Sequence, residues 1–232
     1  MTLDSVHIVL WQPRWARNLG AVARAMKNFG LRRLTVVDSQ IGSWSEAWRM
    51  AVHAHDVLQG AVQVDDLAQA LGPSSFVVGT TNEPPAGARV LTPREVAAEA
   101  AQRDDVTLLF GGEINGLGPT QLLRCHAVSV IPTAPEQSSL NLSQAVAVFG
   151  AELFAANGSV TRDPAPPMAS AELMRRLEDA LRHLLETSAW RDANRGKHAI
   201  AELMQPLWRA QLTEDEVRAW LVAMNKAVQR ES

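Results

Sequence analysis

The chain has 232 residues, of which 47% are apolar and 20% charged, and this balance predicts a packed core rather than a disordered segment. The net charge of −3 gives no global basis for nucleic-acid binding, so any such surface must be local. The single cysteine, Cys125, excludes an internal disulfide framework and a cysteine-based zinc site. No apolar run approaches the roughly 20 residues of a membrane span and no signal peptide is evident, so we expect a soluble, cytoplasmic protein.

Residues 6–38 predict a strand, a loop, a helix and a second strand. Val6–Leu10 is a short apolar run typical of a buried strand, and Leu34–Val37 is the next one. Between them, Gly30 is placed to end a helix whose apolar residues recur at helical spacing, at Leu19, Val22, Ala23, Met26 and Phe29. A unit of this length favours a parallel strand pair with a right-handed crossover.

The same stretch combines polar groups with concentrated positive charge. Asn18 is placed to cap the helix, Gly20 allows the backbone to approach a partner closely, and Arg24 lies on the second turn, off the apolar stripe. No acidic residue precedes Asp38 in a segment with six cationic residues, Arg14, Arg17, Arg24, Lys27, Arg32 and Arg33. The cluster is either an RNA-binding surface or an ordinary solvated face.

After residue 38, short strands and helices alternate up to about residue 156. We expect strands at 61–64, 75–79, 106–110 and 127–131, and helices at 45–53, 65–71, 93–102, 119–124 and 140–156. This alternation predicts an α/β fold, with an open sheet covered by helices on both faces. We therefore assign a first domain to residues 1–157, a linker to residues 158–169, and a helical C-terminal extension to residues 170–232.

Four loops follow predicted strands, where open α/β sheets bind their ligands. They are Gln12–Asn18, Gly79–Asn82, Gly111–Gly118 and Pro132–Asn141. Neither a G-x-G-x-x-G fingerprint nor a P-loop is present, which argues against a Rossmann dinucleotide site and a P-loop nucleotide site.

Each candidate residue in these loops also has a plainer structural explanation. Arg24 fits a solvated helix position, and Glu113 fits the edge of a turn. Ser139 and Asn141 fit the role of helix caps.

Two other pairs of residues do not suggest a site. His53 and His55 lie two residues apart, which does not suit one helix face, so we expect no metal. Cys125 and His126 are expected to pack in the core rather than to form a catalytic pair.

The chain contains N-x-G-x-x-x-R at residues 18–24, G-x-E-x-x-G-L at residues 111–117 and S-S-L-N-L-S at residues 138–143. Taken together, these three motifs resemble the SpoU (TrmH-type) branch of the SPOUT RNA 2′-O-methyltransferases. The first, N-x-G-x-x-x-R, is formed by Asn18, Gly20 and Arg24. The second, G-x-E-x-x-G-L, follows an apolar strand and contains Gly111, Glu113 and Gly116. The third, S-S-L-N-L-S at residues 138–143, follows Ile131 and Pro132. The resemblance covers about residues 5–156.

The resemblance implies a SPOUT fold, a cofactor and an assembly that spacing alone does not show. Residues 106–156 would be threaded into a deep trefoil knot, an exception to the general rarity of knots. The enzyme would be a homodimer in which Arg24 of one subunit completes the site of the other. S-adenosylmethionine would bind in the knot, held by Gly79, Thr80, Thr81, Gly111, Ile131, Ser138, Ser139 and Leu140.

The resemblance also assigns the catalytic site to Arg24, Asn18, Glu113, Ser139 and Asn141. A guanidinium is very hard to deprotonate, so we expect Arg24 to hold a substrate phosphate rather than to act as the base. Asn18, Glu113 and Asn141 would hold the motif loops together. The remaining contacts to RNA phosphates would come from Arg14, Arg17 and Lys27.

Within the family, the run PEQSSLNLSQAV and the helical extension look most like the TrmJ-type enzymes, which methylate the ribose at position 32 of the tRNA anticodon loop. An rRNA 2′-O-methyltransferase, a non-catalytic RNA-binding member and an unrelated nucleotide-using α/β enzyme are the alternatives. The chain departs from the family pattern at Trp15, at Asn82–Pro85 and at Gly112, where Arg or Asn is usual. These departures affect the RNA side rather than the donor site.

Overall fold

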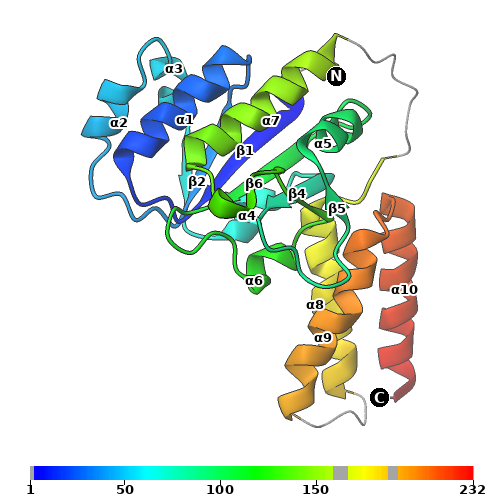
Figure 1. Ribbon diagram of the computed structural model, residues 1–232. Coiled ribbons are helices and arrows are strands. Elements are labelled where there is room, and N and C mark those ends of the chain that lie inside the picture. Colours follow the sequence, from blue (N-terminus) through cyan, green and yellow to red (C-terminus); the bar gives the residue numbers. More distant parts are fainter. Residues whose placement is uncertain (1–2, 159–166, 188–192, 232) are drawn as a thin grey trace.

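The computed structural model describes residues 3–158, 167–187 and 193–231, with only the backbone of 193–198 and 229–231. In this part of the chain one seven-stranded sheet forms the centre, in the order β3-β2-β1-β6-β4-β7-β5. Strands β2, β1, β6 and β4 are labelled near its middle in Figure 1. Every neighbouring pair of these strands is parallel, which confirms the predicted α/β fold. The strands are β1 (Val6–Trp11), β2 (Arg33–Val37), β3 (Val62–Val64), β4 (Phe76–Thr80), β5 (Val90–Leu91), β6 (Val106–Gly111) and β7 (Ala127–Ser129).

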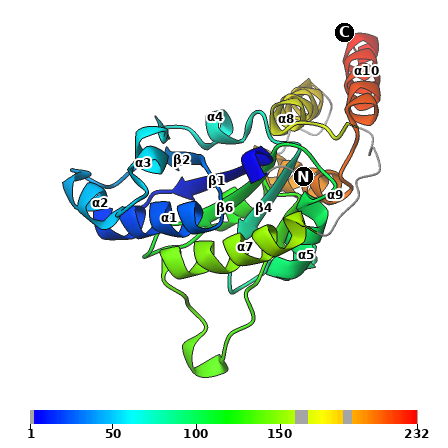
Figure 2. The same cartoon turned by 90° about the horizontal axis from the view of Figure 1, so that it is seen from above.

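Helices cover both faces of this sheet (Figure 2). The first face carries α1 (Ala16–Asn28), α2 (Ser45–Met50), α3 (His55–Gln59), α5 (Pro93–Ala100) and α7 (Leu142–Asn157). The second face carries α4 (Leu67–Leu71), α6 (Pro119–Leu122), α8 (Ala171–Thr187), α9 (Ala193–Arg209) and α10 (Glu214–Glu231). Two short 3-10 turns, Leu3–Ser5 and Pro135–Gln137, complete the described elements.

Strand alternation divides the core into two apolar clusters. Ile8 and Leu10 of β1 pack in the first cluster, and Val9 between them packs in the second. In β6, Leu108 and Leu109 divide in the same way. Because both faces of the central strands are buried, their sequences read as continuous apolar runs.

The sheet order interleaves strands that are distant in sequence. β4 lies between β6 and β7, so the connection from β6 to β7 must cross β4. This interleaving is consistent with the trefoil knot that the resemblance implies, and the knot itself stays a prediction.

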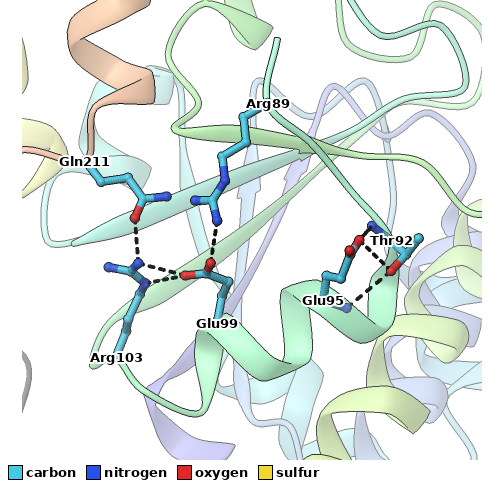
Figure 3. A network of polar contacts seen from close by, with 6 residues as sticks. All are labelled: Arg89, Thr92, Glu95, Glu99, Arg103 and Gln211. Atoms are coloured by element: carbon cyan, nitrogen blue, oxygen red, sulfur yellow. Dashed lines mark hydrogen bonds and ion pairs between the residues drawn. The ribbon is translucent and has the colours of Figure 1, made fainter. Parts of the chain in front are cut away.

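Capping residues explain where several helices begin. Thr92 accepts from the backbone N–H of Glu95, and the Glu95 carboxylate accepts from the backbone of Thr92, a capping box ahead of Pro93 (Figure 3). Thr213 and Glu216 form the same pair at the start of α10. The first capping box stands at the start of the helix predicted at 93–102, and the second lies within the predicted helical extension 170–232.

Some predicted boundaries are wrong. The helix expected at 45–53 ends at Met50, and His53, at φ 62°, separates it from a further helix, α3. The strand expected at 127–131 ends at Ser129. Gly30 does end α1 as predicted, with φ +70°, a conformation that glycine adopts without strain.

The C-terminal helices pack directly against the second face of the sheet. Leu177 of α8 is fully buried there, and Trp208 of α9 lies edge-on to His126 with 4.6 Å between ring centroids. Arg103 joins the two parts of the chain, since its guanidinium bonds the Glu99 carboxylate and the side-chain oxygen of Gln211 (Figure 3). Most of the predicted linker 158–169 lies outside the described residues. None of the described helices combines the length and the apolar character that crossing a membrane requires.

Candidate active site

The loops after β4, β6 and β7 surround a cavity of about 340 Å³ at the carboxyl ends of these strands. A volume of this size is within the range of small-molecule sites. Its wall contains every predicted cofactor residue except Gly79, namely Thr80, Thr81, Gly111, Ile131, Ser138, Ser139 and Leu140. Asn82 donates to Ser138 Oγ at 3.3 Å, so the first and last of these loops also contact each other.

Gly79 is buried within β4 and does not line this cavity. A Cβ at this position would lie 2.8 Å from Cys125 Sγ and 3.0 Å from a methyl carbon of Leu122. The lack of a side chain is therefore explained by packing against α6 and the segment that follows it.

The sequence prediction missed several residues of the cavity wall. Phe110 and Ser129 are found at or next to the last residues of β6 and β7, where the carboxyl-end rule points. Leu142 and Ala145 come from the first turn of α7 and add apolar surface. Ile114 and Asn115 lie between the glycines of the second motif.

The glycine loop after β6 is folded back on itself. Gly116 donates to the carbonyl of Gly112 at 2.9 Å, and a Cβ on Gly111 would lie 2.0 Å from the carbonyl carbon of Gly116. A Cβ on Gly112 would lie 2.3 Å from the carbonyl oxygen of Gln12. The backbone of the loop after β1 therefore occupies the space that a side chain at Gly112 would need.

One chain of hydrogen bonds joins all three motifs. Asn141 donates from Nδ2 to Asn18 Oδ1 at 3.0 Å, and Asn18 donates from Nδ2 to Glu113 Oε1 at 2.8 Å. The other carboxylate oxygen of Glu113 accepts from the backbone N–H of Arg14 at 2.8 Å. We call Asn18, Glu113 and Asn141 the motif junction. It agrees with the expectation that these three side chains hold the loops together.

The hydrogen bonds of the motif junction show whether Asn18 and Asn141 act as helix caps or link the motif loops. The prediction that Asn18 caps α1 is wrong, because the helix begins at Ala16 and the Asn18 side chain is used by Glu113. Asn141 does cap α7, since its Oδ1 accepts from Ser143 N at 2.9 Å, and its Nδ2 serves the junction at the same time. Ser139 lines the cavity, and its side chain caps no described helix.

Gly20 allows a close approach inside the protein. A Cβ there would lie 2.4 Å from the carbonyl oxygen of Ala47 and 2.7 Å from Met50 Cβ. Gly20 therefore lets α1 pack tightly on α2. The group that its backbone approaches belongs to the same chain, which corrects the expectation of a partner from outside.

Arg24 lies on the exposed side of α1 and is absent from the wall of its own chain's cavity. It is six residues beyond Asn18, which places it about 9 Å further along the helix and about a third of a turn around it. Among the described residues it has no hydrogen bond or ion-pair partner. Its guanidinium is therefore free to bind a group from outside the chain.

The basic cluster is partly neutralised by acidic neighbours. Lys27 pairs with Asp56 at 2.5 Å, and the hydrogen bond from Lys27 lowers the pKa of that carboxyl group. Arg17 lies 3.5 Å from Glu46. Pairs at such exposed positions are weak, so an RNA phosphate can displace the carboxylate at little cost.

Cys125 and His126 are buried on the second face, away from the motif junction. Burial raises the pKa of the Cys125 thiol to about 12 and lowers the pKa of His126 to about 3. His126 Nδ1 accepts from Val77 N at 2.9 Å. These environments suit packing rather than nucleophilic chemistry, which confirms the expectation for this pair.

In the described part of the chain, no group of three His, Cys, Asp or Glu side chains is arranged to hold a metal ion. His55 instead contacts the carbonyl oxygen of Trp48 at 2.9 Å.

A parallel α/β sheet with these three linked motifs defines a methylase of the SpoU type. Residues 5–151 match the SpoU rRNA Methylase family, and the chain belongs to this family. The match confirms the resemblance drawn from the motifs.

Curated relatives and a solved structure extend the likeness over nearly the whole chain. The tRNA (cytidine/uridine-2′-O-)-methyltransferase TrmJ of Pectobacterium atrosepticum is 36% identical over 209 residues, 84% of this chain and 85% of the relative. The TrmJ of Yersinia pestis is 32% identical over 97% of this chain and 93% of its own. The crystal structure of TrmJ from Z. mobilis ZM4 superposes with a TM-score of 0.85 at 28% identity, covering 95% of this chain and 97% of that one. The likeness therefore includes the C-terminal helices.

Proposed function

We propose that this protein methylates the ribose 2′-hydroxyl of a cytidine or uridine in tRNA, with S-adenosylmethionine as the donor. The observation that carries the proposal is the motif junction beside the 340 Å³ cavity. The TrmJ relatives, which are named for 2′-O-methylation of cytidine and uridine in tRNA, support the choice of substrate.

The cavity wall fits the parts of the donor. Phe110, Ile131, Leu140 and Leu142 offer an apolar surface for the adenine ring. Hydroxyl groups for the ribose and the amino-acid part come from Thr80, Thr81, Ser138 and Ser139. When bound, S-adenosylmethionine supplies a methyl group on a sulfonium, which is already a good electrophile.

The protein's part in such a transfer is mainly to position the acceptor ribose. A correctly held 2′-hydroxyl reacts as part of one assembly rather than through a bimolecular collision. The motif junction fixes the loop that precedes α1, and Arg24 holds a phosphate next to the reacting ribose. A guanidinium remains protonated, so this role needs no proton transfer at Arg24.

We further propose that the enzyme acts as a homodimer in which Arg24 completes the site of the other subunit. The position of Arg24 on the exposed side of α1, outside its own cavity wall, supports this arrangement. Arg14, Arg17 and Lys27 on the same segment would contact the RNA backbone and provide affinity without sequence choice.

The first test is transfer of labelled methyl from S-adenosylmethionine to tRNA, with the modified nucleotide mapped afterwards. We expect a labelled pyrimidine in the anticodon loop, at position 32 as in the TrmJ-type enzymes. Label at position 34 would instead indicate the specificity of a structural neighbour that is described for the 2-OH methylation of C/U34 on tRNA. Transfer only to rRNA would favour the rRNA alternative, and donor binding without transfer to any RNA would favour a non-catalytic member.

Subunit mixing tests the dimeric site. Arg24→Ala removes the guanidinium, and Ala145→Phe fills the cavity of the chain that carries it, so each homodimer is expected to be inactive. A shared site restores activity on mixing, because the Arg24→Ala cavity receives Arg24 of the Ala145→Phe subunit. Mixtures that stay inactive, although mixed dimers are demonstrated by tagged purification, would place Arg24 in its own chain's site.

A further inference from the structure

A second, smaller pocket lies directly beside the donor cavity. It has a volume of about 120 Å³, and one wall is formed by Gln12, Arg14 and Gln40. The opposite wall is the glycine loop, through Gly112, Ile114, Asn115 and Gly116, and these four residues also line the donor cavity. The two spaces are therefore separated only by the turn that follows β6.

Gln12, which lines the pocket, and Asp38, which bonds its side chain, both have strained backbone conformations. Gln12, which follows β1, has φ 50°, and Asp38, which follows β2, has φ 45°. Such conformations are strained in residues other than glycine and concentrate at functional sites. Here they are held by bonds from Gln12 N to Val37 O at 2.8 Å and from Asp38 N to Val64 O at 2.9 Å.

Asp38 fixes the orientation of both glutamine side chains. Gln12 donates from Nε2 to one carboxylate oxygen at 2.5 Å, and Gln40 donates from Nε2 to the other at 3.3 Å and to the Asp38 carbonyl at 3.0 Å. A carboxamide that places its nitrogen on a carboxylate keeps its oxygen as an acceptor. No residue in the described part of the chain donates to either carboxamide oxygen, so both are free for a ligand.

The chemistry of the pocket matches a single nucleobase. Its wall is mainly polar, Arg14 belongs to the segment expected to contact RNA, and Ile114 is 58% exposed beside it and offers an apolar contact. The volume of about 120 Å³ sets an upper limit of one six-membered ring and leaves no room for a fused pair. Cytosine presents an N4 amino group and uracil an N3–H, and either can donate to a carboxamide oxygen.

We infer that this pocket receives the base of the acceptor nucleotide, and that Gln12 and Gln40 select a pyrimidine. The inference rests on the proposed function and names the specificity-determining residues of the same site. Gly112 also contributes to the geometry of this pocket. With no side chain at this position, the backbone of Gln12 can approach the loop and bring the base pocket against the donor cavity.

Kinetics on three tRNA transcripts that differ only in the target nucleotide test the inference. We expect the wild type to methylate C and U transcripts and to discriminate against A by about 100-fold in kcat/KM. Gln40→Met removes the carboxamide at nearly constant size and should lower kcat/KM on both pyrimidine transcripts by about 10- to 100-fold. Donor affinity measured by calorimetry should stay unchanged, since Gln40 does not line the donor cavity.

A second variant and a matched control show whether a lower kcat/KM comes from the lost contact or from a misfolded protein. Gln12→Asn tolerates the positive φ and keeps an amide but shortens it by one methylene, so it should also lower kcat/KM with normal donor binding. Gln63→Met makes the same change at an exposed position of β3 and should behave as the wild type. An active wild type whose Gln12 and Gln40 variants keep full rate would overturn the inference alone. A wild type that transfers no methyl to any transcript would overturn the proposed function as well.

Discussion

The two faces of the sheet are packed with different kinds of side chains and serve different ends. Beneath α1 and α7, the first face is filled by aliphatic and aromatic groups, including Ile8, Phe110 and Phe149. The second face also buries polar side chains, among them His7, Thr107 and His126, and is covered by the C-terminal helices. The first face thus sets the direction of two helices that supply Asn18, from the first turn of α1, and Asn141, from the cap of α7, to the site. The second face is packed against the C-terminal helices.

The largest expected effect lies on the outer side of the first face. Arg24→Ala should lower turnover by about 1,000-fold, because a charge-bearing contact to the substrate is lost, as with other transition-state donors. Donor affinity and the free energy of unfolding should not change, since the side chain is exposed and has no described partner. Arg94→Ala, at an 89% exposed position on α5, is the control for loss of one arginine. Turnover that survives the change would remove Arg24 from the site.

On the second face the largest effect should be on stability. Leu177→Ala should lower the free energy of unfolding by about 3 kcal/mol, because it leaves a cavity where the Leu177 side chain is fully buried. Urea unfolding measures the loss, and Leu203→Ala, at a 45% exposed position on α9, should change it by less than about 0.5 kcal/mol. Equal effects from the two variants would mean that the C-terminal helices do not stabilise the sheet.

Acidification should also weaken the second face. Burial lowers the pKa of His7 to about 4 and that of His126 to about 3, against 6.5 for a free histidine, so the unfolded chain binds protons that the folded chain refuses. The stabilisation is complete above about pH 6.5 and is lost as the pH falls toward 4 and 3. At pH 5.5 each of these two histidines should lower the free energy of unfolding by about 1.4 kcal/mol relative to its value at high pH.

Urea unfolding at pH 7.5 and pH 5.5 measures this loss. His126→Gln should remove its share of the difference, whereas His183→Gln at an exposed position on α8 should leave it unchanged. The same pH dependence in all three proteins would show that His126 is not its source.

Substitutions of Asn141 distinguish its contribution to stability, through the cap of α7, from its contribution to turnover, through the bond to Asn18. Asn141→Ala should cost about 1 kcal/mol of stability through the lost cap of α7 and should reduce turnover. Asn141→Asp keeps an oxygen for the cap but removes the donor to Asn18, so stability should return while turnover stays low. Thermal unfolding and methyl transfer on the same samples decide this, and recovery of both by aspartate would count against a role for the junction.

The smallest effect concerns the basic segment. Arg17→Ala should weaken tRNA binding by a few-fold and reduce the slope of log affinity against log salt by about 1, since one phosphate contact is lost. Arg49→Ala is the matched control, because Arg49 pairs with the same Glu46 but is not an expected RNA contact. Equal slopes for wild type and Arg17→Ala would place the RNA elsewhere.

Much of the fold was predictable because local signals and global arrangement agree. The apolar runs gave the central strands, and the Thr92-Pro93 and Thr213 starts follow from capping chemistry that operates within four residues. The division into α2 and α3 was not predictable, because it depends on a left-handed His53 that no local residue preference demands.

The site was predictable as far as the motifs are local. Position after a strand brought Thr80, Gly111 and Ser138 to one cavity, as expected. The pairing of Asn18 with Glu113 was expected only from the family resemblance, because a capping residue and a long-range donor look identical in sequence. The base pocket was missed for a similar reason. It depends on a hydrogen bond between Gln12, after β1, and Asp38, after β2, and no sequence spacing predicts this contact.

The motif junction has a consequence for how the chain acquires its activity. Asn18 is 95 residues from Glu113 and 123 residues from Asn141, so the three side chains meet only after β1, β6 and α7 are assembled. Contacts that span such distances form late, because the intervening chain must first lose its freedom. A partly folded chain therefore has no acceptor site, and capacity to modify RNA should return only with the slowest phase of refolding.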